Sequence, residues 1–591
     1  MFRRFLSDRR GNYAMLTVFL MIPIVGGVAL AIDYTQASRH RNITLNALDA
    51  AGMATALHIL KGASDEEAKQ YAKEFFEANL GPIDPAMTKL HVVLPENNAG
   101  GSTLKLSATL NYDPIFYPAF QAMRGASGEE TAMTISASSE VRLKNTVEVA
   151  LVLDNSGSMA YTGLGSGKKR IDLLKEAAKQ LVETMAGQAG QVKQVVKPVQ
   201  FGIVPFAASV NVGPENANAS WMDTDGLSPV HHENFNWDTM EARNPNKRVE
   251  LVRGIYRKVG KGWKEEEGDK VTRFTLYDEI KDRTRGDVDA KWAGCVEMRP
   301  YPHGLSDEPA SWTRPETLFV PMFAPDETDQ PDGRRRPPND WWADQTGGDA
   351  KFRQEFMPKY FHAVANPSIQ SGQGPNYSCT TRPITPLTDV ASAAGMKKIK
   401  DSIDAMRADG ATNVPEGMAW GWRVVSGRAP FTEGRDDAER GNDKIVIVLT
   451  DGANTYYTPE SLGRHDNAGN KSTYSNYGYA KNGRIFEGTT ANWWDYSNDN
   501  YTEAMNQQFD KLCSNAKDES IIVITVALDL DDRKRAERGQ IEALERCASE
   551  SRFRKDGNGK PAKLFWNATG GDLAEKFKEI ADELSNLRFV S

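Results

Sequence analysis

Short, almost continuous apolar runs alternate with amphipathic stretches from about residue 146 onward. The first run, residues 147–153 (VEVALVL), has the length and β-branched content of a strand that is covered on both faces. Further strands are expected at residues 201–206, 209–212 (a short edge strand), 445–449, 521–528 and 564–566. Apolar residues at spacings of three and four predict helices at residues 171–185, 396–406, 505–516, 541–547 and 573–587. This alternation predicts a doubly wound, mostly parallel α/β sheet.

The N-terminal region has a different pattern, a single long apolar stretch at residues 11–32. Its apolar part is about 20 residues long, which is enough to cross a membrane as a helix. Basic residues precede it: Arg3, Arg4, Arg9 and Arg10. Such residues stay in the cytoplasm, so the chain after Asp33 should lie outside. A cleaved secretory signal is the alternative, because residues 29–31 (ALA) have the small-x-small form, but the apolar stretch exceeds the usual signal core. We therefore expect an uncleaved anchor.

Residues 36–145 show the pattern of a small α+β module. An alanine-rich helix is expected at residues 43–60, and residues 65–67 (DEE) open a second, shorter helix. Strand-like alternation follows at residues 90–94, 104–110 and 133–141. The alanine-rich helix fits two interpretations equally: packing on its own module, or binding a partner as an extension of the anchor.

Two long segments lack any regular periodicity, at about residues 213–383 and 454–501. Both are rich in aromatic residues, Gly and charge, and segments this long are uncommon unless they are functional or folded. Their Tyr and Trp side chains could form a recognition surface near the sheet or pack a private core. The expected domains are an anchor (1–35), the α+β module (36–145) and an α/β domain (146–591) that contains both insertions.

Composition and motifs narrow the function. The net charge of −8 argues against a general nucleic-acid binder. None of the four cysteines, Cys295, Cys379, Cys513 and Cys547, forms a CxxC pair. In an oxidising compartment we expect disulfides Cys295–Cys379, within the first insertion, and Cys513–Cys547, on the helices that flank one strand. Residues 163–169 fail the Walker spacing, and no GxSxG motif is present. We therefore expect a binding protein and not an enzyme.

Polar residues stand where the predicted strands end. Asp154, Ser156 and Ser158 follow the first strand, Asp451 follows the strand at 445–449, and Thr412 precedes a helix. Such folds bind ligands beyond the carboxyl ends of their strands. Oxygen donors alone suit Mg²⁺ best, with Mn²⁺ or Ca²⁺ as alternatives, and leave a coordination position for water or a carboxylate from outside. The simpler alternative is that Asp154 and Ser156 only cap a helix.

Taken together, the DxSxS, GATN and TDG segments resemble the metal-ion-dependent adhesion site of von Willebrand factor A domains. The resemblance implies an A-type fold. It also implies that Ser156, Ser158 and Thr412 contact the metal, and that Asp154 and Asp451 bind it directly or through water.

A second resemblance covers the N-terminal region. The segment "RRGNYAMLTVFLMIPIVGGVALAIDYTQASRHRN" is similar to Tad (Flp) pilus-assembly proteins of the TadE/TadG kind, and "WAGCVEMRP", "PITPLTD" and the C-terminal region resemble the large A-domain protein of that system. This implies a single-pass protein of the bacterial inner membrane with its bulk in the periplasm. Its partners would be proteins of a pilus or secretion machine, and one of them could supply the carboxylate. A cell-surface adhesin that binds host or cell-wall ligands is the alternative.

Overall fold

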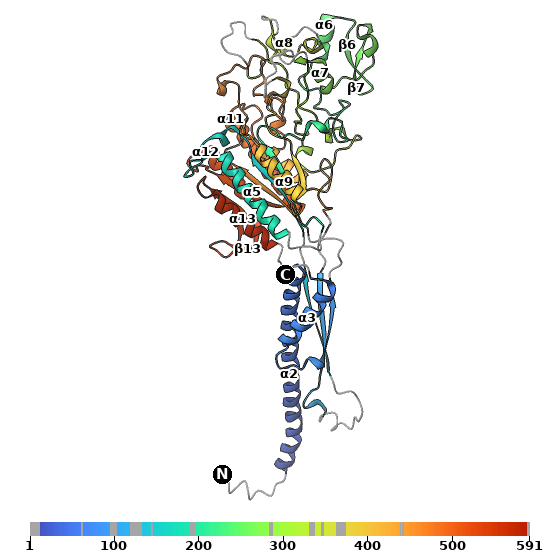
Figure 1. The fold of residues 1–591 in the computed structure, drawn as a ribbon, viewed down its shortest axis with the longest axis vertical. Helices are drawn as coiled ribbons and strands as arrows, with labels where there is room; N and C mark the ends of the chain where they lie inside the picture. The colour runs from blue at the N-terminus through green and yellow to red at the C-terminus, as the bar shows by residue number, and fades with distance from the viewer. Residues whose placement is uncertain are drawn as a thin grey trace. The chain divides into compact units, whose positions relative to one another are not determined.

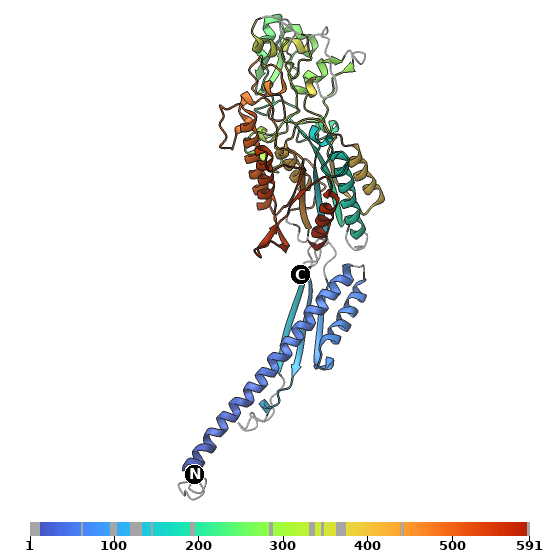
Figure 2. The same ribbon diagram turned by 90° about the vertical axis from the view of Figure 1, so that its left-hand side faces the viewer.

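The chain forms two compact units in a computed structural model (Figures 1 and 2). The first comprises Met1–Asn145 with Gln191–Val196 and Phe589–Ser591, and the second comprises Thr146–Gly190 and Lys197–Arg588. The structure describes residues 12–60, 63–94, 103–118, 133–142, 146–189, 196–282, 288–329, 337–343, 348–361, 374–437, 439 and 442–587. The four N-terminal arginines lie outside the described residues.

A single helix, α2 (Asn12–Leu60), dominates the first unit. The apolar stretch and the alanine-rich stretch, which the sequence suggested as successive helical segments, are therefore continuous. Among the described residues, one helical segment, Leu16–Ile59, is long and apolar enough to cross a membrane, and its most apolar 18-residue window has a mean hydropathy of 2.2. Its apolar side chains are open to the surroundings, as for Phe19, which is 73% exposed. A membrane anchor and a signal sequence both fit this finding.

The rest of the first unit packs on the C-terminal half of α2. Helix α3 (Asp65–Asn79) begins with a capping box between Ser64 and Glu67. Strands β1 (Thr88–Val93), β2 (Thr103–Tyr112) and β3 (Met133–Arg142) form an antiparallel sheet in that order.

The alanine-rich face of α2 is buried against this sheet. Leu48 and Ala51 share an apolar cluster with Leu106 of β2, and a Cβ on Gly52 would lie 2.9 Å from Val141 Cγ2. Small residues here let the helix approach the sheet closely. Of the two interpretations of this helix, packing on its own module is therefore the one that the structure supports.

The second unit is built on a mixed, mostly parallel six-stranded sheet. Its order is β10-β5-β4-β11-β12-β15, and only the pairing of β10 with β5 is antiparallel. The strands are β4 (Thr146–Asp154), β5 (Val199–Phe206), β10 (Thr385–Asp389), β11 (Asn442–Thr450), β12 (Ile522–Leu528) and β15 (Phe565–Ala568).

Helices cover both faces of this sheet because alternate side chains of each strand point to opposite sides. One face packs on α5 (Arg170–Ala189), α9 (Ala393–Ala405) and α13 (Leu573–Leu587), with α5 between the other two (Figure 1). The other face packs on α10 (Val414–Val425), α11 (Asn498–Asp518) and α12 (Arg535–Cys547). In β4, for example, Leu151 lies in the apolar cluster with α5, α9 and α13, and Val152 lies in the apolar cluster with α10, α11 and α12.

The prediction of an edge strand at residues 209–212 is wrong. In that segment Val210 and Asn211 make only isolated bridges, and the edge position beside β5 is taken by β10, which follows the first insertion. Pro386 has no N–H to donate and is tolerated in a sheet only at an edge or a bulge. The register of β10 shifts between Thr385 and Thr388, on either side of this proline.

The insertions bury most of their aromatic residues. Six tryptophans of the first insertion are at most 6% exposed: Trp221, Trp237, Trp263, Trp292, Trp341 and Trp342. They belong to the same apolar cluster as Val152 of the sheet, so the first insertion extends the domain core. In the second insertion, Tyr474, Tyr477 and Tyr479 are buried, whereas Trp493 and Trp494 are 65% and 63% exposed. Core packing therefore accounts for most of these aromatic residues, and the two exposed indoles remain on the surface.

A buried ionic cluster joins the two insertions. Glu297 of the first insertion binds Arg273 of the same insertion and Arg484 of the second, the latter at 2.6 Å. Burial opposes ionisation of Glu297, but the two guanidinium groups outweigh it and lower the pKa of this carboxyl group. Removing one partner would leave an uncompensated buried charge, so the cluster holds the insertions in one arrangement.

Both expected disulfides are present, Cys295–Cys379 and Cys513–Cys547. The first closes a sequence separation of 84 residues in a region with little regular secondary structure. The second joins α11 to α12 across a separation of 34 residues.

We expect the double substitution Cys513→Ser/Cys547→Ser to lower the free energy of unfolding by about 4 kcal/mol, because a loop of this length no longer restricts the unfolded chain. The measurement is chemical denaturation of the detergent-solubilised chain followed by tryptophan fluorescence. An unchanged unfolding midpoint would contradict the expected contribution, and the wild-type chain unfolded under reducing conditions serves as the comparison.

Candidate metal centre

The five predicted donor residues lie at the carboxyl ends of two neighbouring strands and on one adjoining loop. Asp154 is the last residue of β4, and Asp451 directly follows β11. The two strands are parallel, with Leu153 opposite Leu449, so their ends meet. Ser156 and Ser158 lie in the loop after β4, and Thr412 precedes Asn413, which caps α10 by accepting the N–H of Glu416.

Hydrogen bonds bring these side chains together. The Oγ atoms of Ser156 and Ser158 are 3.0 Å apart, and Ser158 Oγ donates to Asp451 Oδ1 at 2.5 Å. A Cβ on Gly452 would lie 3.6 Å from both Ser158 Oγ and Thr412 Oγ1, so both hydroxyls border the residue that follows Asp451. Ser156 is the N-cap residue of a short 3-10 helix, Gly157–Ala160, but its side chain makes no capping hydrogen bond, and Asp154 accepts the N–H of Ser156.

Asp154 lies just beneath this group. Its Oδ1 accepts the N–H of Ser156 and its Oδ2 accepts the hydroxyl of Thr450, both at 2.7 Å. These two bonds orient the carboxylate toward the loop and hold the loop backbone in place. Asp154 is therefore connected to the other four residues through Ser156.

The loops that carry the donors are fastened to one another by backbone contacts. Gly157 N–H donates to the carbonyl of Gly410, and Asp409 N–H donates to the carbonyl of Asn155, at 2.9 and 2.7 Å. Thr412 N–H donates to Thr455 Oγ1, and Thr455 N–H donates back to the carbonyl of Thr412, each at 2.8 Å. The donor geometry is thus built into the fold.

The electrostatics of the site favour a cation. Burial raises the pKa of Asp154 to about 7, and the nearby charge of Asp451 contributes to the increase. Burial also raises the pKa of Asp451, although hydrogen bonds from Ser158 and Arg170 oppose this. Two buried carboxylates that repel each other are stabilised by positive charge placed between or beside them.

Two charged residues near Asp451, Arg170 and Asp529, were not predicted from the sequence. Arg170, at the start of α5, donates from Nη1 to Asp451 Oδ2 and from Nε to Asp529 Oδ2, both at 2.9 Å. Asp529 also accepts the N–H groups of Leu164 and Gly570. Asp529 directly follows β12, so a carboxylate at the end of the next parallel strand was a signal available in the sequence. Nothing in the sequence marked Arg170, because its role depends on where α5 begins.

The donor set fits a hard divalent cation. Only carboxylate and hydroxyl oxygens converge here, which suits Mg²⁺, Mn²⁺ or Ca²⁺ and does not suit zinc or copper. In the part of the chain that the structure describes, no group of three or more His, Cys, Asp or Glu side chains is arranged to hold a metal. A metal at this place would therefore depend on the three hydroxyls as much as on the two carboxylates.

The similarity of this chain to known proteins is weak. No family model and no curated protein matches it. Among solved structures it is similar to the pilus adhesin SpaC from Lactobacillus rhamnosus GG, at 12% identity and a TM-score of 0.30, over 85% of this chain and 35% of that chain. The chain thus covers about a third of SpaC.

It is also similar to the vWF domain of the type V pili tip protein Mfa5 from Porphyromonas gingivalis, at 11% identity and a TM-score of 0.28, over 75% of this chain and 96% of that chain. The PilB minor pilin from Streptococcus sanguinis gives 11% identity and a TM-score of 0.29, over 85% and 79% of the two chains. Likenesses of this size carry no argument about function, so the site is interpreted from its own geometry.

We expect Arg170→Ala to make folding stability depend more strongly on divalent metal than it does in the wild type. Without the guanidinium group, the buried carboxylates of Asp451 and Asp529 lose their charged hydrogen-bond donor, at a cost of about 2 kcal/mol in EDTA. Bound Mg²⁺ would restore part of this loss. The measurement is the unfolding free energy in EDTA and in Mg²⁺, for wild type and variant.

Arg533→Ala is the matched control, because Arg533 pairs with Asp531 at an exposed position. It should change stability little under either condition. Equal losses for Arg170→Ala in EDTA and in Mg²⁺ would contradict the expected coupling between Arg170 and the metal site.

Proposed function

We propose that the protein is a membrane-anchored factor that binds a protein partner through a divalent cation, with Mg²⁺ as the first candidate and Mn²⁺ or Ca²⁺ as alternatives. The observation that carries this proposal is the hydrogen-bonded group of Ser156, Ser158 and the Asp451 carboxylate, with the Thr412 hydroxyl next to Gly452, the residue that follows Asp451. The cation would supply an open coordination position that accepts a carboxylate from the partner. The function is binding, and no catalytic role is assigned to these residues.

The strand order supports assignment of the second unit to the von Willebrand factor A type. Numbered along the chain, the sheet β10-β5-β4-β11-β12-β15 has the order 3-2-1-4-5-6, with one antiparallel strand at an edge. Doubly wound sheets of this order bind their ligands where the strand order reverses, beyond the carboxyl ends of the strands. Strands β4 and β11, which flank that reversal, are the two that end in Asp154 and Asp451.

The proposed roles of the donors follow from their contacts. Ser156, Ser158 and Thr412 would contact the cation through their hydroxyl oxygens. Asp154 and Asp451 would bind it directly or through water. Asp451 already shares its second oxygen with Arg170, so this arginine positions the carboxylate and reduces the negative charge that faces the cation.

We assign the partner to a Tad/Flp-type pilus assembly or secretion machine on the basis of the N-terminal sequence. In this assignment the apolar part of α2 crosses the bacterial inner membrane, the arginines before it stay in the cytoplasm and the chain after Asp33 lies outside. The two disulfides are consistent with an oxidising compartment.

A cell-surface adhesin is the second candidate, and the exposed pair Trp493 and Trp494 favours it. Adjacent exposed indoles are typical of recognition surfaces. A gene neighbourhood that encodes a secretion ATPase and pilins would support the assembly factor, whereas exposure of the protein on the cell surface would support the adhesin.

The metal site is tested by titrating the full chain in detergent with Mn²⁺ and following free Mn²⁺ by electron paramagnetic resonance. We expect one specific site in the wild type. The double variant Asp154→Ala/Asp451→Ala should abolish binding at this site, because both carboxylates are removed. The variant Ser156→Ala/Thr412→Val should weaken binding about tenfold or more while keeping the charge unchanged.

Asp401→Ala, a substitution of an exposed carboxylate on α9, is the control for nonspecific loss of charge. Circular dichroism shows whether each variant remains folded. If the folded double variant bound Mn²⁺ as tightly as the wild type, the site assignment would be wrong.

The anchor is tested by membrane fractionation of cells that express the full chain. We expect the chain to remain in the membrane after alkaline carbonate extraction, because an uncleaved apolar helix is held by the hydrocarbon core. Protease added to spheroplasts should digest the region after residue 33 and spare an N-terminal tag. A shortened, soluble chain would show instead that the helix is a cleaved signal.

A further inference from the structure

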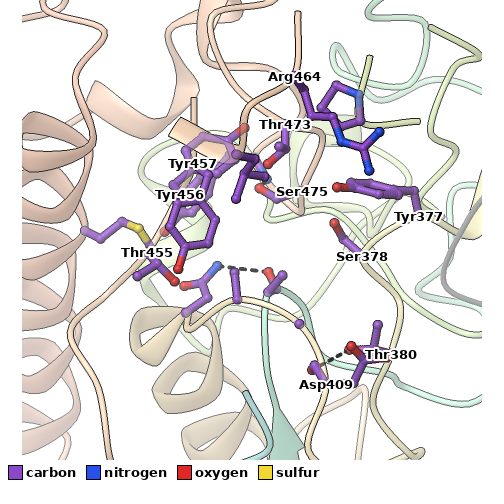
Figure 3. A pocket seen from close by; sticks show the side chains of 18 residues that line it. Tyr377, Ser378, Thr380, Asp409, Thr455, Tyr456, Tyr457, Arg464, Thr473 and Ser475 are labelled. Atoms are coloured by element: carbon purple, nitrogen blue, oxygen red, sulfur yellow. Dashed lines mark hydrogen bonds between the residues drawn. The ribbon is translucent and has the colours of Figure 1, made fainter. Parts of the chain in front are cut away.

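A cavity of about 510 Å³ opens beside the loop that carries Thr412 (Figure 3). Its walls come mainly from residues 377–380 of the first insertion, residues 455–477 of the second, and residues 409–413, which we call the metal loop. Ala208, Pro338 and Met505 complete the lining. Its size is within the usual range of ligand pockets. We refer to it as the tyrosine cavity because Tyr377, Tyr456, Tyr457 and Tyr477 line it.

The tyrosine cavity and the metal loop share one hydrogen-bonded framework. Thr455, in the cavity wall, exchanges two hydrogen bonds with Thr412. Asn413 Nδ2 donates to Asn476 Oδ1 at 2.8 Å, which ties the metal loop to the second insertion. A ligand group at the metal and a ligand group in the cavity would therefore be held at a fixed separation.

The wall from the first insertion is also fixed in place. Ser378 Oγ donates to the carbonyl of Tyr474, and Thr380 Oγ1 donates to the carbonyl of Asp409 at 2.9 Å. The neighbouring Cys379 is bonded to Cys295. A cavity with walls held in this way is formed before any ligand arrives, which reduces the entropic cost of binding.

The cavity offers hydrogen-bonding groups and one positive charge. The hydroxyls of Tyr377 and Tyr457, which both line the cavity, make no hydrogen bond among the described residues. Figure 3 shows the Tyr377 hydroxyl directed into the cavity. Arg464 is exposed at the rim, near Tyr377, and makes no ion pair within the described part of the chain. Tyrosines of this kind provide large contact areas together with a polar group.

These features favour an acidic peptide over other ligands. Nucleic acid would require several cations, whereas the cavity has one arginine and also contains Asp409. If a partner protein binds the metal through a carboxylate side chain, the residues next to that side chain must lie beside the metal loop. The tyrosine cavity is the space next to this loop. A peptide backbone can hydrogen-bond to the free tyrosine hydroxyls, and a second acidic side chain can pair with Arg464.

We propose that the tyrosine cavity receives the segment of the partner protein next to its metal-bound carboxylate, and that this segment carries a second acidic side chain that binds Arg464. The proposal rests on the metal-dependent binding function proposed above. It adds a sequence requirement for the partner: two acidic residues separated by a short run that packs against the tyrosines.

The test is selection of a random peptide library, displayed on phage, on the full chain in detergent with Mg²⁺. We expect peptides with two acidic residues around a short spacer to be enriched and to be released by EDTA. With a synthetic peptide of the enriched sequence, Arg464→Glu should weaken binding about tenfold, because attraction becomes repulsion at an exposed site. The same variant should bind Mn²⁺ as the wild type does.

Arg253→Glu is the matched control, since it makes the same charge change at an exposed position that does not line the cavity. It should leave peptide affinity unchanged. A second variant, Tyr377→Phe, keeps the ring and removes only the free hydroxyl, and it should weaken binding by a smaller factor than Arg464→Glu.

The outcomes separate this inference from the function on which it rests. Absence of Mn²⁺ binding by the wild type would overturn the metal site itself. If Mn²⁺ binds, the cavity proposal is overturned when no peptide is enriched, when enriched peptides lack the second acid, or when Arg464→Glu leaves their affinity unchanged. Binding of oligosaccharides in place of peptides on a glycan array would likewise overturn it.

Discussion

Two buried carboxylates, Asp154 and Asp451, set the main physical constraint on the second unit. Both lie away from water at the ends of adjacent parallel strands, where their charges repel each other. Such an arrangement costs free energy unless fixed donors and positive charge compensate for it. The fold meets this requirement with the hydroxyls of Thr450 and Ser158, a backbone N–H and the guanidinium group of Arg170. A divalent cation completes the compensation in our proposal, so that the same constraint explains both the local structure and the expected ligand.

The insertions form a framework around this point. Their tryptophans extend the apolar core of the sheet, and the ionic cluster around Glu297 joins one insertion to the other. The chain of hydrogen bonds from Asn413 to Asn476 and on to Glu416 then connects the second insertion to the start of α10, next to Thr412. The long irregular segments therefore contribute to the core, and hydrogen bonds hold the second insertion beside Thr412.

The first unit depends on the close packing of small residues. Alanines and Gly52 on α2 allow the helix to lie against β2 and β3, while its N-terminal half keeps its apolar side chains exposed. Asp33 stands between these two halves and accepts the N–H groups of Ile115, Phe116 and Tyr117. The N-terminal part of α2 therefore has an exposed apolar surface, whereas its C-terminal part packs against the sheet.

The sequence by itself determined the mostly parallel sheet, its main helices, the apolar N-terminal helix and the pairing of the cysteines, because these depend on local periodicity and on neighbouring elements. It also identified Asp154, Ser156, Ser158, Thr412 and Asp451 as candidates, since polar residues after parallel strands share one edge of the sheet. Only the tertiary structure decided that Thr385–Asp389 forms the edge strand, because that pairing spans a long insertion. It alone revealed Arg170, Asp529 and the tyrosine cavity, which arise from contacts between residues far apart in the chain and leave no periodic pattern in the sequence.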